Sequence, residues 1–157
     1  HGPHQDQTAA YTGVIPIMLN KIDDDEQPVI NGDGSQAYDF IDVEDAGRCN
    51  IDALNADCTD EFYNVGTGIQ TSIRDLCDKI LELRSSKLIV KYNPYSEDDA
   101  RRLVQNRIGS PIKAEKDLGF KYKYDLETLD VFSRENEYVG KRKYDKQYKV
   151  YYVDYKV

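Results

Sequence analysis

The spacing of apolar residues predicts the main helices of the chain. Apolar positions recur at helical spacing over residues 12–22, 43–56 and 73–83, and the last of these stretches has the most regular apolar face. Pro16 fits the first helix only if it lies in the first turn, where no helical hydrogen bond needs its missing amide hydrogen. A shorter helix is expected over residues 112–118.

Residues that favour helix ends mark two of these segments. Thr71 or Ser72 can cap the most regular helix at its N-terminus, because a hydroxyl oxygen accepts hydrogen bonds from free amides there. For the short helix, Ser110 is the expected cap, Pro111 occupies the first helical position and Gly119 follows the last turn. The ends of both helices are therefore predicted as well as their faces.

Short apolar runs between the helices predict strands. They cover residues 28–30, 62–65 and 87–92, and a further strand is expected to begin at Phe40 and Ile41. Because strands and helices alternate along the chain, the sequence predicts an α/β domain with the character of a small α+β lobe.

Two glycine-containing segments each have a structural and a ligand-binding interpretation. Gly32-x-Gly34-x-x-Ala37 matches a loose dinucleotide fingerprint, but it runs into a predicted strand and not into a helix, so a hairpin turn is favoured. Gly66-x-Gly68 precedes the most regular helix, whose free amides would favour an anion. A tight turn between a strand and a helix needs the same glycines, so the structural interpretation is favoured there too.

Composition and charge narrow the class of protein. The chain has 157 residues and a net charge of −8, which argues against nucleic acid as a partner, because phosphate backbones are bound by clustered Lys and Arg. Its apolar stretches are far shorter than the roughly 20 residues that span a bilayer, so no membrane partner is expected. Cys49, Cys58 and Cys77 lack the spacing of zinc or redox motifs, and no basic and apolar leader precedes His1. These features predict reduced thiols and a cytoplasmic protein.

No catalytic group and no metal site is predicted from the residues. His1 and His4 have no carboxylates or thiols at ligand spacing nearby. Tyr152 and Lys156 lie four residues apart, as in a tyrosine general base assisted by a lysine, but their stretch resembles a strand, in which the two side chains would not share a helix face. The pair is therefore not taken as catalytic.

The arginines at positions 101, 102 and 107 form the most prominent basic group of this acidic chain. Guanidinium groups suit diphosphates, because their fork of donors matches two phosphate oxygens. Surface ion pairs with Glu97, Asp98 and Asp99 are an equal alternative from the sequence.

The last part of the chain has a different composition. Residues 134–157 are basic and rich in tyrosine, whereas the residues before them are acidic. Residues 148–157 have the polar and aromatic pattern of a strand without turn residues. The sequence predicts a lobe over residues 1–128 and a divergent Tyr- and Lys-rich tail over residues 129–157.

Three segments carry a resemblance to a known family: His1-Gly2-Pro3, the run from Gly32 to Asp45, and Tyr63 to Gly68. Together they resemble the second half of the NAD-dependent nucleotide-sugar epimerases and dehydratases, which are extended short-chain dehydrogenases/reductases. In that family a first, Rossmann half carries the glycine fingerprint and the catalytic Tyr-x-x-x-Lys pair. The resemblance implies that this chain is the C-terminal, substrate-binding portion of such an enzyme and lacks the first nucleotide-binding half.

The resemblance also implies which residues contact the ligands. It assigns a helix that borders the nucleotide, a strand that holds uracil through backbone groups, and arginines near ribose and phosphate. The implied substrate-binding residues are Gly13, Val14, Met18, Val29, Ile30, Asn31, Tyr38, Asp99, Arg101 and Arg102, and those toward the cofactor are Gly2 and Pro3. Tyr38 stands where many members have a diphosphate-binding arginine, and Arg101 or Arg102 is the expected substitute.

Two further departures from the family pattern affect the expected stability. Asp42 puts an acid into a region that is packed in the family, and Gly47 introduces a helix-weakening residue. Some loss of stability is therefore expected.

The function implied by the resemblance is that of a UDP-sugar 4-epimerase that uses NAD. This chain alone is expected to be inactive, since the glycine-rich loop and the catalytic pair belong to the other half. A sugar-nucleotide dehydratase or decarboxylase on the same scaffold is an alternative, and a non-catalytic truncated binding or interaction protein is an alternative from another class. The complete enzyme is expected to be a homodimer, and the isolated chain is expected to self-associate through an uncovered apolar face.

Overall fold

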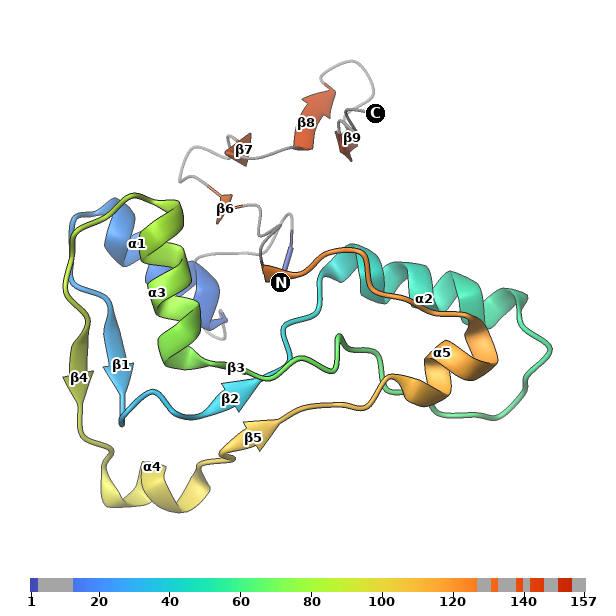
Figure 1. Cartoon of the computed structure of the whole chain (residues 1–157), viewed down its shortest axis with the longest axis horizontal. Coiled ribbons are helices and arrows are strands. Elements are labelled where there is room, and N and C mark those ends of the chain that lie inside the picture. Colours follow the sequence, from blue (N-terminus) through green and yellow to red (C-terminus); the bar gives the residue numbers. More distant parts are fainter. Residues whose placement is uncertain (3–12, 127–130, 133–137, 140–141, 146–149, 154–157) are drawn as a thin grey trace.

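Helices and short strands alternate along an elongated body (Figure 1), which confirms the predicted α/β class. The computed structural model describes residues 1–2, 13–126, 131–132, 138–139, 142–145 and 150–153. Its helices are α1 (Val14–Asp23), α2 (Val43–Asn55), α3 (Ile73–Leu83), α4 (Glu97–Arg102) and α5 (Ile112–Leu118). Its strands are β1 (Val29–Asn31), β2 (Ala37–Tyr38), β3 (Thr71–Ser72), β4 (Lys91–Asn93), β5 (Asn106–Arg107), β6 (Val131–Phe132), β7 (Tyr138–Val139), β8 (Arg142–Asp145) and β9 (Val150–Val153).

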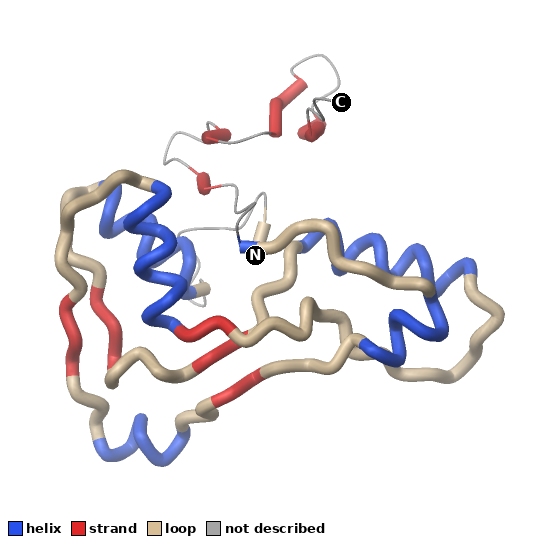
Figure 2. The backbone as a smooth tube through the Cα atoms, viewed as in Figure 1, coloured by secondary structure: helices blue, strands red, loops and turns tan. Residues whose placement is uncertain are grey.

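Two small sheets organise the body (Figure 2). β1 pairs with β4 in parallel, with Ile30 opposite Tyr92. β2 lies between β3, to which it is antiparallel, and β5, to which it is parallel. Parallel strands need a long crossover connection, and the connection from β1 to β4 contains both α2 and α3.

The turn predicted at Gly32 and Gly34 is confirmed, but the hairpin predicted around it is wrong. Both glycines have positive φ, 77° and 75°, which glycine adopts without strain. The strands on either side, β1 and β2, belong to different sheets. A Cβ atom on Gly32 would also overlap the ring of Tyr95, so close packing requires this glycine as well.

The larger hydrophobic cluster lies where α1 and α3 pack side by side next to β1 (Figure 1). Pro16 is buried in the first turn of α1, as predicted, so the helix keeps its hydrogen bonds while the ring adds to the core. The cluster is built from the buried residues Ile15, Met18, Leu19, Ile22, Ile30, Ile73, Leu76, Cys77 and Ile80.

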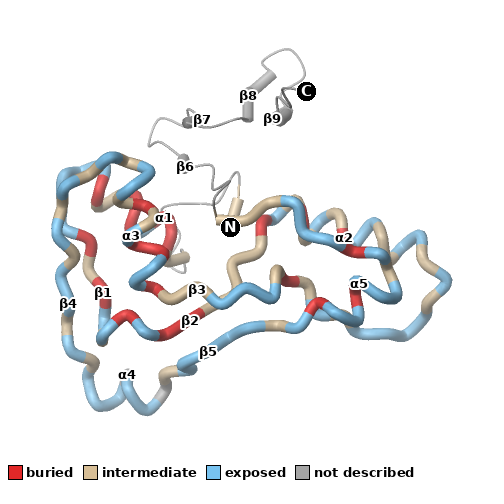
Figure 3. The backbone as a smooth tube through the Cα atoms, viewed as in Figure 1, coloured by how far each residue is buried: buried red, intermediate tan, exposed pale blue. Residues whose placement is uncertain are grey.

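A smaller hydrophobic cluster lies at the other end of the body, where α2 packs against α5 (Figure 3). Its buried members are Cys49, Ala114 and Phe120. Asp45 of α2 is fully buried beside them, 2.6 Å from the Arg48 guanidinium. The Asp45 carboxylate also accepts hydrogen bonds from the amides of Lys123 and Tyr124, at 2.9 and 3.0 Å, and so connects the segment after α5 to α2.

The predicted helix ends are largely confirmed. Ser72 caps α3, since its hydroxyl accepts a hydrogen bond from the Asp75 amide at 3.0 Å. Gly119 ends α5 in the left-handed conformation with φ 69°. Ser110 is not the cap of α5, because the residue at the N-cap position is Pro111, which has no side-chain hydrogen-bonding group.

The strand predictions need correction, apart from β1. β2 ends at Tyr38, so Phe40 and Ile41 lie after a strand and not in one. Residues 62–65 form no strand, and of residues 87–92 only the last two belong to β4. The apolar residues of these runs pack against the two clusters but are not paired with another strand. The apolar pattern of the runs therefore reflects burial and not strand pairing. The residues are Tyr63, Val65, Leu88 and Val90.

Asp42, the acid expected in a packed region, has hydrogen-bond and charge partners in the structure. Its side chain accepts a hydrogen bond from the Glu44 amide at 2.8 Å, which makes it the N-cap of α2. It also lies 3.5 Å from the His1 imidazole. The acid is therefore buried, as expected, and it is partnered; the expected loss of stability stays a prediction.

Gly47 keeps its expected helix-weakening effect, and Gly47→Ala is predicted to stabilise the protein by roughly 0.5–1 kcal/mol. Gly47 is in α2, is exposed, and a Cβ atom there would meet nothing within 4 Å. Urea unfolding followed by circular dichroism measures the change. Gly119→Ala is the control: it is expected to destabilise by about 1 kcal/mol, because φ 69° strains alanine. Equal effects of the two changes would contradict this account.

Several large apolar side chains are exposed near the smaller cluster. Leu54 is 85% exposed, Phe62 91% and Ile112 68%. An exposed apolar surface favours association, and the predicted self-association of this chain stays a prediction based on these residues.

In the tail, β8 pairs with β9 in an antiparallel ladder, and β9 lies within the stretch predicted to be a strand. The boundary near residue 128 stays a prediction. Within the residues that the structure describes, no helix has the length and apolar content needed to cross a bilayer.

Candidate functional site

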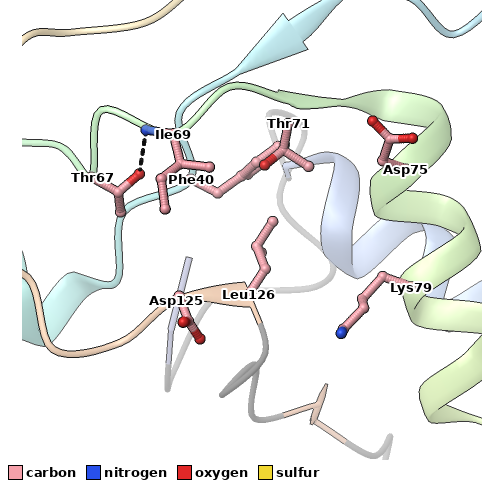
Figure 4. Close-up of a pocket in the computed structure, with 8 residues that line it drawn as sticks. All are labelled: Phe40, Thr67, Ile69, Thr71, Asp75, Lys79, Asp125 and Leu126. Atoms are coloured by element: carbon pink, nitrogen blue, oxygen red, sulfur yellow. Dashed lines mark hydrogen bonds between the residues drawn. The ribbon is translucent and has the colours of Figure 1, made fainter.

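A cavity of about 260 Å³ opens where the segment after β2, the loop before β3 and the start of α3 meet (Figure 4). Its volume is close to the lower end for small-molecule sites, roughly 300–1,000 Å³. Its walls are Phe40, Thr67, Ile69, Thr71, Asp75, Lys79, Asp125 and Leu126. The residues come from three separate parts of the chain, so the cavity forms only when the body is folded.

The cavity combines an apolar floor with a few polar groups. Phe40, Ile69 and Leu126 supply apolar surface, and the Lys79 side chain extends from α3 toward the side of the cavity where Leu126 lies (Figure 4). Asp75 is fixed at the start of α3, because its carboxylate accepts a hydrogen bond of 2.6 Å from the Ser72 hydroxyl. Such an arrangement suits part of a ligand that has both an apolar body and polar groups.

One side of the cavity is positioned by a hydrogen-bonded carboxylate, that of Asp39. Asp39 accepts hydrogen bonds from the Thr67 amide at 3.0 Å, the Thr67 hydroxyl at 2.6 Å and the Gly68 amide at 2.9 Å. A Cβ atom on Gly66 would overlap the same carboxylate. The structural interpretation of Gly66-x-Gly68 is therefore confirmed: its amides bind an acid of the chain itself, and β3 separates the loop from α3.

A row of aromatic and cationic side chains leads away from the cavity along β2 and β5. The rings of Tyr38 and Phe40 lie 6.2 Å apart in an edge-to-face arrangement. Tyr38 is opposite Arg107 in the parallel pair of β2 and β5, and the Arg107 guanidinium carbon is 5.9 Å from the Tyr38 ring centroid. Phe40 is not among the substrate residues that the family resemblance implied, and Arg107 was singled out only as a member of the basic group at positions 101, 102 and 107.

Comparison with known proteins identifies the family. Residues 1–66 match the model of the NAD dependent epimerase/dehydratase family. The putative UDP-glucose 4-epimerase of Methanocaldococcus jannaschii is 33% identical over 126 residues, which cover 80% of this chain and 39% of that protein. The chain belongs to the NAD-dependent epimerase/dehydratase family.

Solved epimerase structures share the fold. The UDP-glucose 4-epimerase of Thermotoga maritima, determined with UDP-glucose, has a TM-score of 0.72 at 30% identity, covering 81% of this chain and 39% of its own. The UDP-N-acetylglucosamine 4-epimerase of Methanobrevibacter ruminantium, in complex with UDP-N-acetylmuramic acid, has a TM-score of 0.70 at 30% identity and covers 80% and 38%. The chain thus spans about two fifths of the length of these epimerases.

The epimerase-family residues implied on α1 and β1 lie in or beside the larger cluster. Met18 is 2% exposed and Ile30 1%, so their side chains belong to the core. Gly13, Val14 and Val29 are half-buried, and Asn31 is exposed. The backbone of Val29–Asn31 forms the ladder with β4.

Gln36, which the sequence analysis missed, supports that strand. It is 8% exposed, and its side-chain amide donates a hydrogen bond to the Asn31 carbonyl at 3.2 Å.

The residues implied near phosphate and cofactor are brought together only in part. Arg101 is exposed on α4 and lies 3.7 Å from Glu97, a contact of the kind that the surface-pair alternative expects, and its assignment to phosphate stays a prediction. The backbones of Asp99 and Arg102 also belong to α4, but their side chains lie outside the described residues, as does Pro3. Gly2 has φ 143° and packs against Val43, whose amide donates a hydrogen bond to the His1 carbonyl at 2.7 Å.

The titratable residues that the structure describes in this epimerase-family chain bear on two kinds of chemistry, metal binding and reactive thiols. In the described part of the chain, no group of His, Cys, Asp and Glu has the arrangement of a metal site. All three cysteines are free, and burial raises the pKa of the Cys49 thiol and that of Cys77, the latter to about 11. These two thiols are therefore poor nucleophiles and have a structural role.

Proposed function

We propose that this chain is the UDP-sugar-binding, C-terminal portion of an NAD-dependent nucleotide-sugar 4-epimerase. The observation that carries the proposal is the shared fold, at 30% identity, with a UDP-glucose 4-epimerase determined with UDP-glucose. The similarity to a second epimerase, determined with another UDP-sugar, supports the same ligand class. Within this proposal, residues 1–128 form the binding lobe and residues 129–157 a divergent tail.

The described residues do not offer a dinucleotide site, so the hydride chemistry belongs to another part of the complete enzyme. The loop from Gly32 to Ala37 enters strand β2 and not a helix. The first amides of α3, those of Ile73 and Arg74, donate to the carbonyls of Gln36 and Gly34 in this loop, at 3.0 and 3.1 Å, so they are not available to a pyrophosphate. When bound, NAD would accept and return a hydride at the sugar. This chain contributes the nucleotide end of the substrate site, where the cavity holds part of the ligand and the backbone of β1 borders it.

Titration calorimetry of the 157-residue chain with UDP tests the proposal. We expect saturable binding at or below millimolar UDP, because the cavity and β1 are formed within this chain. GDP is the control nucleotide and is expected to bind more weakly, since a site that pairs with uracil leaves polar groups unsatisfied against guanine. No heat at millimolar UDP, or equal binding of GDP, would remove the proposed ligand class.

A further inference from the structure

We propose that Arg107 is the side chain that binds the diphosphate of the nucleotide sugar. This inference rests on the function proposed above, because it assigns one part of that ligand to one residue. It replaces the assignment of the phosphate to Arg101 or Arg102 that the sequence implied. The argument depends on where the guanidinium lies, on what it contacts and on how the other arginines are engaged.

Arg107 does not line the cavity, but two aromatic rings connect it to the cavity wall. It is on β5, directly opposite Tyr38 of β2, and the Tyr38 ring in turn contacts Phe40, which forms part of the cavity wall. A ligand that fills the cavity and extends along Phe40 and Tyr38 therefore reaches the Arg107 guanidinium. The remaining neighbours on β5 and β3 are uncharged, as in the hydrogen bond of 3.3 Å between Gln70 and Asn106.

The guanidinium of Arg107 is oriented but retains its donors. Its contact with the Tyr38 ring is a cation–π interaction, which uses the face of the guanidinium plane and leaves the N–H groups at its edge for an acceptor. Among the residues that the structure describes, no carboxylate forms an ion pair with Arg107. A phosphate that binds there would meet a pre-oriented fork of donors.

The other arginines whose side chains are described are engaged elsewhere. Arg48 pairs with Asp45, Arg84 with Asp23 at 3.0 Å, and Arg101 with Glu97. The Arg74 guanidinium donates to the Asp33 carbonyl.

Inside the cavity, two carboxylates, those of Asp75 and Asp125, share the wall with Lys79. A diphosphate at that end would meet like charges. At the Arg107 end the nearby acid is Asp39, whose amide donates to the Arg107 carbonyl at 3.0 Å and whose carboxylate is already the acceptor for Thr67 and Gly68.

The test compares UDP with uridine, because only UDP carries the diphosphate. We expect Arg107→Gln to weaken UDP binding by about 10- to 100-fold, the range for charge-assisted hydrogen bonds. Uridine binding, followed by nuclear magnetic resonance titration, should stay unchanged. Arg107→Lys keeps the charge but loses the fork and should weaken UDP binding by about 3- to 10-fold. Lys87→Gln, at an exposed cation outside the row, controls for net charge and should bind UDP like the unchanged protein.

The outcomes separate this inference from the proposed function. If the unchanged protein and Arg107→Gln bind UDP equally, the assignment of Arg107 is overturned and the UDP-sugar site stands. If Arg107→Gln weakens uridine as much as UDP, Arg107 does not act on the diphosphate. If the unchanged chain binds neither ligand, both the site and the assignment fall. Thermal unfolding of each variant establishes that it is folded. If Arg107→Gln does not fold, Arg107→Lys provides the comparison of UDP with uridine instead.

Discussion

Asp45→Ala is expected to lower the free energy of unfolding by about 3–5 kcal/mol, the largest effect of any single change considered for this chain. The Asp45 side chain is fully buried, 2.6 Å from Arg48, and it accepts amide hydrogen bonds from Lys123 and Tyr124. Removing it takes the counter-charge from Arg48, which keeps only the Lys121 carbonyl as an acceptor among the described residues, and leaves two amide donors without theirs. Each lost partner adds to the penalty. The segment after α5 would also lose its connection to α2.

Urea unfolding with two spectroscopic probes measures this effect. Asp52→Ala is a matched control, since Asp52 lies on the same helix, is only half-buried and should change stability by less than about 0.5 kcal/mol. Asp45→Asn should fall between the two, because the amide keeps one acceptor oxygen but not the charge. The structural role assigned to Asp45 is refuted if Asp45→Ala and Asp52→Ala unfold at the same urea concentration.

Asp39→Ala is the second change with a large expected effect, a loss of about 2–3 kcal/mol. The Asp39 carboxylate is the acceptor for both amides and the hydroxyl of the Thr67–Gly68 loop. Because Thr67 lines the cavity, the same change should weaken UDP binding at the proposed site. Asp39→Asn should be nearly as harmful, since its NH2 group would face an amide that also donates.

A comparison with Asp33 isolates the effect of the loop. The Asp33 carboxylate also accepts two hydrogen bonds, from the amide and hydroxyl of Ser35, but it is exposed to solvent and does not line the cavity. Asp33→Ala is therefore expected to cost less than about 1 kcal/mol and to leave UDP binding unchanged. Thermal unfolding and calorimetric titration of both variants provide the measurement. Equal losses of stability and of UDP binding for Asp33→Ala and Asp39→Ala would show that the contact of Asp39 with the Thr67–Gly68 loop contributes no more than an exposed turn does.

The helices of this chain can be predicted from its sequence because the residues that determine them are close together in the sequence. The apolar stripe of α3, the Ser72 cap and the first-turn Pro16 each lie within one turn or two of the feature that they determine. The strands cannot be predicted in the same way. β2 is two residues long and exists because β3 and β5 lie on either side of it, and neither partner is near in sequence.

The candidate site shows the same division between local and distant information. The family resemblance located the region, including Tyr38 and the strand Val29–Asn31, but not the contacts that complete it. Arg107 meets Tyr38 only through the parallel pairing of β2 and β5, which no local pattern encodes. Asp39 stands out in the sequence as an acid between two aromatic residues next to a strand. Its role as a hydrogen-bond acceptor depends on the Thr67 loop, which lies far along the chain.

The separation of the two hydrophobic clusters has a consequence for how cooperatively the body unfolds. The cluster around α1 and α3 and the one around α2 and α5 share no buried residue, and extended segments, among them that of Asp39, connect them. We therefore expect each cluster to open with its own free energy of local unfolding. The smaller cluster has three buried members, so its free energy of opening is expected to be the lower of the two. The cavity takes its wall from helix α3 of the larger cluster, from the connecting loop and from Asp125 and Leu126. A ligand held there would thus stabilise the unit that contains α3 directly. It would reach the unit that contains α2 through the Asp39 contact and through Tyr124, whose amide donates to Asp45 of α2.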